Sequence, residues 1–194
     1  IAVATKFFAV GARVPNIAPL KGAVCTQALT NPLYGPHGLR LIRENVGAAD
    51  IVRILTTPDA GRDHRQLHVM GADGKFAAHT GAECVPWCGH WIGENMSVAG
   101  NMLAGPQVVA ETVRTMRERH DLPLPRRLIA AMKAGEAAGG DKRGKQSAAL
   151  LIYGNQDYSE LDLRVDDHTE PLQELERLEE VSRERWTHFR AFVP

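Results

Sequence analysis

The dipeptide Asp73-Gly74 constrains the fold more than any other short stretch of this chain. It interrupts the segment RQLHVMGADGKFAAHTG, in which apolar and polar residues alternate on both sides. Asp-Gly between two alternating segments is typical of a tight β-hairpin, because glycine readily adopts the positive φ that such a turn needs. The pattern therefore predicts an antiparallel sheet in the middle of the chain.

Four other apolar segments have the composition of strands. They are residues 1–10, 22–29, 147–154 and 161–167. The first two are joined by residues 11–21, which contain glycine and proline and are expected to form a loop. The glycine-rich residues 90–105 are consistent with either strand or loop.

Five segments are predicted to be amphipathic helices, because their apolar residues recur at helical spacing. They are residues 36–46, 47–57, 106–120, 123–138 and 169–186. Strands, two helices, strands, two helices, strands and a last helix follow one another, which suggests helices on more than one face of the sheets. The sequence therefore predicts the α/β (α+β) class, with residues 1–194 forming a single layered domain.

The charge balance and the cysteine count indicate which partners and which compartment to expect. The chain has 23 Lys and Arg residues and 23 Asp and Glu residues, so it lacks the basic field of a nucleic-acid binder. No apolar run approaches the ~20 residues of a membrane-spanning helix. Three cysteines cannot all pair within one chain, which favours a reducing compartment. We therefore expect a cytoplasmic protein without nucleic-acid or membrane partners.

The segment IAVATKFFAV at residues 1–10 has the composition of a buried strand from its first residue. A buried strand needs a neighbour that satisfies its backbone hydrogen bonds. We therefore expect a further N-terminal strand before Ile1 in the natural protein.

Residues 139–147, GGDKRGKQS, place one acid, three cations, an amide and a hydroxyl at the entry to an apolar strand. One interpretation is structural: the glycines end a helix and the charges lie in water. The other is catalytic: Asp141 orients an amine or hydroxyl, and Ser147 passes a proton. Spacing alone leaves both interpretations open.

Two other groups contain metal-ligand residue types without the usual spacing. They are Cys84, Cys88 and His90, and, further along, Asp166, Asp167 and His168. The cysteines lack a second ligand pair, and adjacent carboxylates point to opposite faces of an extended chain. The turn at 139–147 also lacks the Gly-Lys-Ser/Thr ending of a phosphate-binding loop. We expect no metal and no cofactor.

Five segments together resemble one known family. They are GAVCTQALTNPLYGPHGL, HRQLHVMGADGKFAAHTGAEC, GNMLAG, GGDKRGKQSAALL and LDLRVDDH. Their order and sequence are similar to domain of unknown function 1028, a mainly bacterial family. The resemblance implies a fold like that of the N-terminal-nucleophile (Ntn) hydrolases, a four-layer α-β-β-α sandwich of two antiparallel sheets. It also implies that a short strand with Ser or Thr near its start precedes this chain.

The Ntn resemblance implies candidate roles for polar residues. In such enzymes the first residue attacks an amide while its own α-amine, with a pKa near ~8, accepts the proton. The implied catalytic residues are Asp141 and Ser147, which orient the amine, Lys6, which tunes it, and Asn101, which stabilises the oxyanion. The implied substrate-binding residues are Thr5, Thr26, Gln27, Asn31, His79 and Thr80.

Two departures from the family pattern keep the function open. Ile1 has no nucleophilic side chain, and Cys25 stands where alanine is more usual. The resemblance implies an Ntn-type amidohydrolase of a small substrate, with its nucleophile outside this chain. Alternatives are a non-catalytic module that binds a small polar ligand between the sheets, a structural subunit, and a metal-dependent hydrolase. The fold class and the apolar stripe of residues 172–181 suggest a homodimer.

Overall fold

The computed structural model describes residues 1–193, whose strands form three antiparallel sheets. The first sheet has the order β1 (Ala2–Thr5), β8 (Ser147–Tyr153), β9 (Ser159–Val165). The second has the order β2 (Pro15–Ala18), β3 (Gly22–Ala28), β4 (Arg65–Met70), β5 (Phe76–Thr80). The third pairs β6 (Gly89–Ile92) with β7 (Ser97–Gly100). The predicted mixed α/β class with antiparallel sheets is confirmed.

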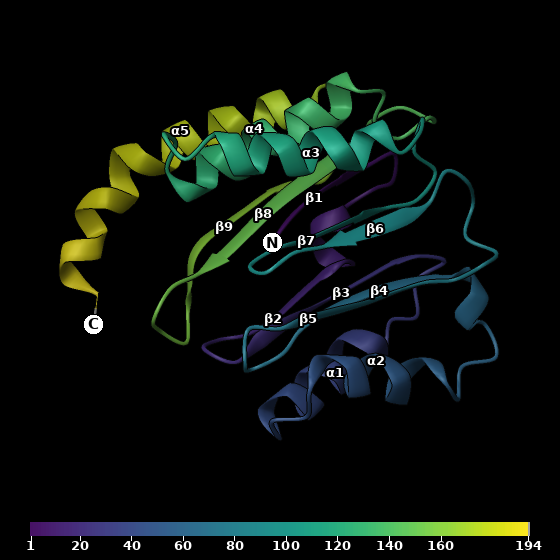
Figure 1. Cartoon of the computed structure of the whole chain (residues 1–194). Helices are drawn as coiled ribbons and strands as arrows, with labels where there is room; N and C mark the ends of the chain where they lie inside the picture. The colour runs from purple at the N-terminus through teal and green to yellow at the C-terminus, as the bar shows by residue number, and fades with distance from the viewer. Residues whose placement is uncertain (194) are drawn as a thin grey trace.

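The helices lie in two groups on opposite sides of the sheets (Figure 1). The second sheet is covered by α1 (Tyr34–Arg43) and α2 (Ala48–Thr56). The first sheet and the β6–β7 pair are covered by α3 (Gln107–Glu118), α4 (Leu124–Ala137) and α5 (Pro171–Phe189). Among residues 1–193, no helix combines the length and the apolar character needed to cross a bilayer.

The Asp73-Gly74 hairpin is present as predicted. It joins β4 to β5, with Met70 opposite Phe76. Gly74 has a φ of 76°, and the Asp73 carboxylate accepts a hydrogen bond from the Lys75 amide at 3.1 Å. The glycine therefore provides the backbone conformation that the turn requires, and the aspartate fixes the next amide.

Each helical group buries its own apolar core. One core, beneath the second sheet, contains the buried residues Ala18, Val24, Tyr34, Ile42, Ala48, Ile51, Leu55, Leu67 and Val69. The other, above the first sheet, contains Ile129, Ala148, Leu150, Ile152, Val165, Leu172 and Leu175. Because the two cores lie on the outer, helix-covered faces, the inner faces of the two sheets are left to form a site.

Two N-terminal predictions were wrong. The strand expected over residues 1–10 ends at Thr5, because Asp141 accepts a hydrogen bond from the Lys6 amide and Ser147 accepts one from the Val10 amide. These bonds turn the backbone into a 3₁₀ helix at Val10–Ala12. The expected loop at residues 11–21 contains β2, whose first residue, Pro15, lies on an edge strand where a missing amide donor is tolerated.

The apolar stripe of α5 is largely buried against its own sheet. Leu172 and Leu175 belong to the core, and Leu178 packs against it. Only Val181 in this stripe is substantially exposed, at 45%. Core packing therefore accounts for most of the stripe, and a homodimer remains a prediction.

Gly38 lets α1 approach β3 closely. A Cβ at this position would lie 2.8 Å from Cγ2 of Val24, which is inside van der Waals contact. We expect Gly38→Ala to destabilise the protein by about 1–3 kcal/mol, because overpacking outweighs the better helix propensity of alanine. Urea unfolding measures this change. Gly47→Ala is the control, since a Cβ there meets no atom within 4 Å; equal stability of both variants would contradict the account.

Candidate functional site

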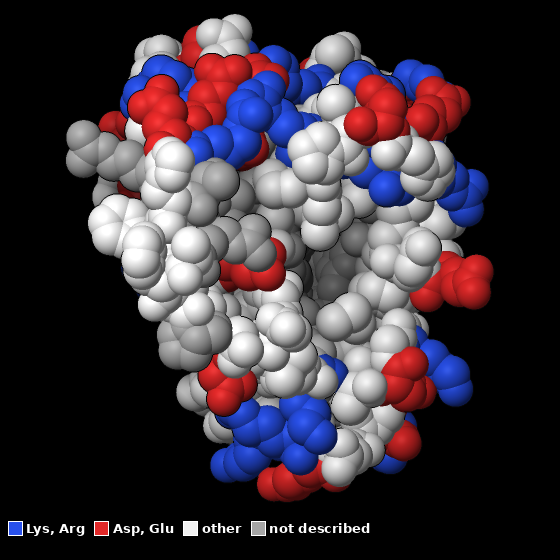
Figure 2. All heavy atoms as spheres, turned by 90° about the vertical axis from the view of Figure 1, so that its left-hand side faces the viewer, with Lys and Arg blue, Asp and Glu red and all other residues white. Residues whose placement is uncertain are grey.

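A cavity of about 1360 Å³ lies between the sheets. Its walls are β1, the inner faces of β2 and β3, strand β7, and the apolar faces of α3 and α4. Figure 2 shows a hollow on one face of the molecule, with a mostly uncharged visible rim. The cavity is therefore accessible and bounded by elements that are far apart in sequence.

Register decides which residues of β3 and β4 face this cavity. Residues directly opposite each other in an antiparallel pair share a face of the sheet. Cys25 lies opposite His68, and Gln27 lies opposite Gln66. Cys25, Gln27 and His68 line the cavity, whereas Val24, which precedes Cys25, faces the α1–α2 core. The inner face of this sheet is therefore polar at Gln27, Gln66 and His68, and the outer face is apolar at Val24 and Leu67.

The side chain of Gln66 is the centre of a buried hydrogen-bond network. Its residue is 0% exposed. Its Nε2 lies 3.1 Å from the Gly89 carbonyl oxygen, 3.0 Å from the Gly100 carbonyl oxygen and 2.9 Å from Oγ1 of Thr80. Its Oε1 accepts hydrogen bonds from Nε2 of Gln27 at 2.6 Å and Nδ2 of Asn101 at 3.2 Å. One amide thus connects the second sheet, the β6–β7 pair and the loop after β7.

His68 makes a second connection between β4 and β7. Its Nδ1 lies 2.7 Å from Oγ of Ser97. Its Nε2 is buried and has no hydrogen-bond partner among the described residues. Burial lowers the pKa of His68 to about 4, and the charge of His90 adds to this effect, so the imidazole is neutral at pH 7.

Asp141 closes one end of the cavity. Its Oδ2 accepts hydrogen bonds from Oγ1 of Thr5 at 3.1 Å and from the Lys6 amide at 3.2 Å. Arg143 donates to both carboxylate oxygens through its side chain and to Oδ1 through its amide. A backbone bridge joins Asp141 to Leu103. The turn therefore fixes the end of β1 beside the loop that carries Asn101.

The carboxylate of Asp141 is stabilised in its charged form. Burial alone would raise the pKa of Asp141, but the Arg143 side chain and the amides of Arg143 and Lys6 donate to the charged form and lower it. Arg143 also lies 3.3 Å from Oγ1 of Thr5. The acid and the cation therefore neutralise each other at the point where they contact β1.

Ser147 lies opposite Thr5, on the face of the first sheet that is turned toward the cavity, but the segment that follows β1 covers its side chain. It is 0% exposed, and its Oγ accepts from the Val10 amide at 3.1 Å and donates to the Phe7 carbonyl at 2.5 Å. The hydroxyl holds the turn that follows β1. Asp141 and Ser147 thus bind different parts of one backbone segment and do not converge on one point in the cavity.

The structure brings four of the predicted site residues to the cavity. They are Thr5, Gln27, Asn101 and Asp141. Two of the others lie outside the cavity lining. Lys6 is exposed next to Asp141, and Oγ1 of Thr80 contacts the buried side chain of Gln66. Thr26 and His79 both lie opposite Leu67, so they occupy the helix-covered face of the second sheet. Their positions prevent direct contact with a molecule in this cavity.

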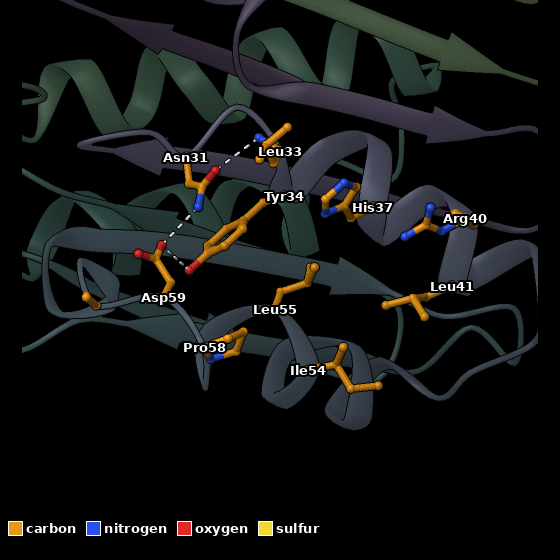
Figure 3. Close-up of a pocket in the computed structure, with 11 residues that line it drawn as sticks. Asn31, Leu33, Tyr34, His37, Arg40, Leu41, Ile54, Leu55, Pro58 and Asp59 are labelled. Atoms are coloured by element: carbon orange, nitrogen blue, oxygen red, sulfur yellow. Dashed lines mark hydrogen bonds between the residues drawn. The ribbon is translucent and has the colours of Figure 1, made fainter.

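Asn31 lines a different, smaller pocket of about 400 Å³ beside α1 and α2 (Figure 3). There Oδ2 of Asp59 accepts hydrogen bonds from Nδ2 of Asn31 at 3.0 Å and the Tyr34 hydroxyl at 2.8 Å. The hydrogen bonds from Asn31 and Tyr34 hold the pKa of Asp59 well below its usual range. Gly61 and Arg65 also donate to this carboxylate. These groups stabilise the loop after α2.

The thiols do not converge on a metal site. Sγ of Cys84 donates to the Arg65 carbonyl at 3.3 Å, and Sγ of Cys88 lies 3.5 Å from the Cys84 carbonyl. Nδ1 of His90 instead lies 2.9 Å from Oγ1 of Thr80. Within residues 1–193, no three His, Cys, Asp or Glu side chains are grouped so that they could hold a metal ion.

Cys25 is a weak nucleophile despite its place in the cavity wall. Burial raises the pKa of its thiol to about 11. Only about one molecule in ten thousand would carry the reactive thiolate at pH 7. The structure therefore gives no support to Cys25 as a replacement for an N-terminal nucleophile.

The acidic group after β9 is also dispersed. Asp166 pairs with Arg164, and Asp167 accepts a hydrogen bond from Gln146 at 3.1 Å. Nδ1 of His168 accepts a hydrogen bond from the Glu170 amide at 2.9 Å, which fixes the start of α5. The three side chains bind separate partners, so their arrangement does not resemble a metal centre.

Sequence analysis missed Gln66, His68 and Arg143 as site residues. Gln66 and His68 alternate with apolar residues in RQLHVM, a pattern that places both on one face of β4. That signal was available, but nothing in the sequence indicated that this face lines a cavity. Arg143 was visible only as one of three cations in a turn.

Comparisons with known proteins give two matches. A model of a family of unknown function, DUF1028, matches residues 1–175. Among solved structures, the crystal structure of protein SPO2555 from Silicibacter pomeroyi, also described as DUF1028, has a TM-score of 0.87 and 32% sequence identity. The match covers 94% of this chain and 79% of that chain. A comparison with curated proteins gave no match.

Removal of the Ser147 hydroxyl tests its structural role. We expect Ser147→Ala to lower the free energy of unfolding by about 1–3 kcal/mol, because the buried Val10 amide would lose its acceptor. Urea denaturation measures this loss. Ser182→Ala, which removes a hydroxyl from α5, should change stability much less. A Ser147→Ala protein as stable as the Ser182→Ala protein would contradict the assignment.

Buried neutral His68 makes stability depend on pH. Its folded pKa of about 4 lies below the unfolded value of ~6.5, so the unfolded state binds the proton first as the pH falls. The stabilisation that neutral His68 contributes to the folded state is complete above about pH 6.5 and is lost toward pH 4. We expect His68→Gln to reduce the difference in unfolding free energy between pH 7 and about pH 4.5 by about 2 kcal/mol. His120→Gln, at an exposed position, is the control; identical pH profiles for wild type and His68→Gln would refute this account.

Proposed function

The chain belongs to the family of unknown function DUF1028, and we propose that it is an Ntn-type amide-bond hydrolase. In this proposal its helices and sheets are the four-layer Ntn sandwich, over one domain that spans residues 1–194. The nucleophile is a Ser, Thr or Cys at the start of a strand that precedes Ile1. The observation that carries the proposal is the pair of edge strands, β1 and β7, which belong to separate sheets and both line the cavity.

The strands β1 and β7 both lie at edges of their sheets. β1 pairs only with β8, and β7 only with β6, among the described residues. The two belong to separate sheets, yet both line the cavity. Ile1 exchanges hydrogen bonds with Leu151, so the backbone groups of Ala2 and Ala4 point away from β8. These groups are available to an additional strand.

The spacing of the covering helices fits one such strand. α4 packs against β1, α3 packs against β7, and α3 and α4 are neighbours. Packed helices lie about 8–10 Å apart. Two steps of the strand spacing in a sheet span about 9.6 Å. A single strand between β1 and β7 would therefore join both edges into one continuous sheet.

The direction of that strand follows from the chain. Thr5, at the end of β1, and Leu103, just after β7, both contact Asp141, so β1 and β7 run toward the same end of the cavity. A strand that leads into Ile1 through a tight turn must run antiparallel to β1. Its first residue would then lie at the Asp141 end, among Thr5, Arg143 and Asn101.

These surroundings suit Ntn chemistry. The first residue's oxygen or sulfur attacks the amide carbon while its side-chain proton passes to its α-amine. The amine then protonates the leaving nitrogen as the C–N bond breaks, and water hydrolyses the resulting ester or thioester. Asp141 would accept a hydrogen bond from the α-amine, and the second N–H of Asn101 would stabilise the oxyanion. In this proposal Arg143, which contacts Thr5, takes the cationic role first predicted for Lys6.

One observation favours a second function, the binding of a small polar ligand without turnover. Asp141 already accepts bonds from Thr5, Lys6 and Arg143, which leaves its oxygens little capacity for an amine. Thermal-shift screening separates the two functions. A ligand at 100 times its Kd would stabilise the protein by ~2.7 kcal/mol, and it would be recovered unchanged if the protein only binds it.

The maturation of the natural protein tests the hydrolase directly. We expect that expression with the residues preceding Ile1 yields a mature chain that begins with Ser, Thr or Cys, as measured by intact mass. A β-lactone probe should acylate that first residue, and tandem mass spectrometry should locate the adduct there. A retained initiator Met without labelling would overturn the proposal.

Replacement of Asp141 tests its proposed role at the amine. We expect Asp141→Asn to slow β-lactone labelling by at least about 100-fold, because the base would lose its orienting carboxylate. Asp121→Asn is the matched control, since Asp121 pairs with Arg119 two residues away, as Asp141 pairs with Arg143. Circular dichroism of both variants verifies folding. Equal labelling rates would remove Asp141 from the mechanism.

A further inference from the structure

The orientation of three amides at the cavity wall is fixed by their hydrogen bonds. Gln66 contacts the carbonyl oxygens of Gly89 and Gly100, which can only accept, so the contacting atom of Gln66 must be its nitrogen. Its oxygen therefore accepts from the side chains of Gln27 and Asn101. Both of those residues must present nitrogen to Gln66.

The same argument fixes what Gln27 and Asn101 offer to the cavity. Their carbonyl oxygens, Oε1 and Oδ1, receive no hydrogen bond from any residue that the structure describes. Each NH₂ group has two hydrogens, and one of them is used on Gln66. Both residues line the cavity. Each therefore presents one acceptor and one donor to a bound molecule.

The polar groups along this wall carry no free charge. His68, which also lines the cavity, has an unpartnered Nε2, and its low pKa keeps it neutral. The two acids that line the cavity are both paired, Asp141 with Arg143 and Glu136 with Lys145. Arg13 and Lys21 also line the cavity but are exposed, so a carboxylate or ammonium buried against this wall would find no buried counterion and would pay a large desolvation cost. The remainder of the cavity wall includes apolar residues of α3 and α4.

We infer that the wall formed by Gln27, Asn101 and His68 is a recognition subsite for an uncharged carboxamide. An amide group has one acceptor and two N–H donors, which match the donors and acceptors that Gln27 and Asn101 offer. His68 completes the wall as a neutral side chain whose Nε2 is buried and unpartnered among the described residues. This inference rests on the proposed function in naming its substrate class, a neutral amide with an apolar body.

The experiment compares three probes that share one apolar chain: hexanamide, hexanoate and hexylamine. Their dissociation constants are measured at pH 7 by ligand-observed NMR on the full natural chain, without any assay of turnover. We expect hexanamide to bind about tenfold more tightly than hexanoate or hexylamine. Only the amide can both donate to and accept from the side chains of Gln27 and Asn101. Equal binding of all three probes, tightest binding of a charged probe, or no binding at all would overturn the inference.

Two variants assign the selectivity to this wall. Gln27→Met keeps a similar side-chain volume and should raise the Kd of hexanamide about tenfold, to the level of the charged probes. Asn101→Leu should do the same if Gln27→Met fails to fold. Gln173→Met, at an exposed position of α5, is the matched control and should bind like wild type. Unchanged selectivity in a folded Gln27 or Asn101 variant would refute the assignment.

The outcome is separable from that of the hydrolase proposal. Selective amide binding without a processed or labelled N-terminus would retain the subsite and reject the catalysis. A processed, labelled protein that binds all three probes equally would retain the catalysis and reject the subsite.

Discussion

The buried amide of Gln66 is the interaction on which the arrangement of the cavity depends. It contacts carbonyl oxygens of both strands in the β6–β7 pair and receives hydrogen bonds from β3 and from the loop after β7. A fully buried amide is tolerated only when its donors and acceptors are satisfied. The requirement to satisfy this one side chain therefore positions three parts of the chain relative to one another.

Much of the fold could be predicted from local patterns in the sequence. Asp73-Gly74 identified the β4–β5 hairpin, and apolar spacing located the helices. The end of β1 could not be predicted, because side chains about 135 residues away, Asp141 and Ser147, capture the backbone that follows it. Strand β2 was missed because Pro15 at its start and Pro19 directly after it are typical of a loop, although an edge strand accommodates a proline at its first residue.

The candidate site was predicted less well, because neighbouring residues of a strand point to opposite faces of the sheet. Thr26 and Gln27 are adjacent, and so are His79 and Thr80, yet the two members of each pair occupy opposite faces of the sheet. Composition identifies polar strand residues but does not say which face lines a cavity. The role of Ser147 could not be decided from the sequence, since a hydroxyl at a strand entry satisfies a buried amide as readily as it serves a reaction.

The pairing of Asp141 with Arg143 has a consequence for the kinetics of association. Together with a net charge of zero and a mostly uncharged visible rim (Figure 2), it leaves the cavity with little long-range field, because the other lining cations, Arg13 and Lys21, are exposed to solvent and screened. Diffusional encounter is then not accelerated by electrostatic steering, and its rate should vary little with ionic strength. Discrimination among small molecules is consequently exerted after entry, through dissociation rates set by short-range contacts.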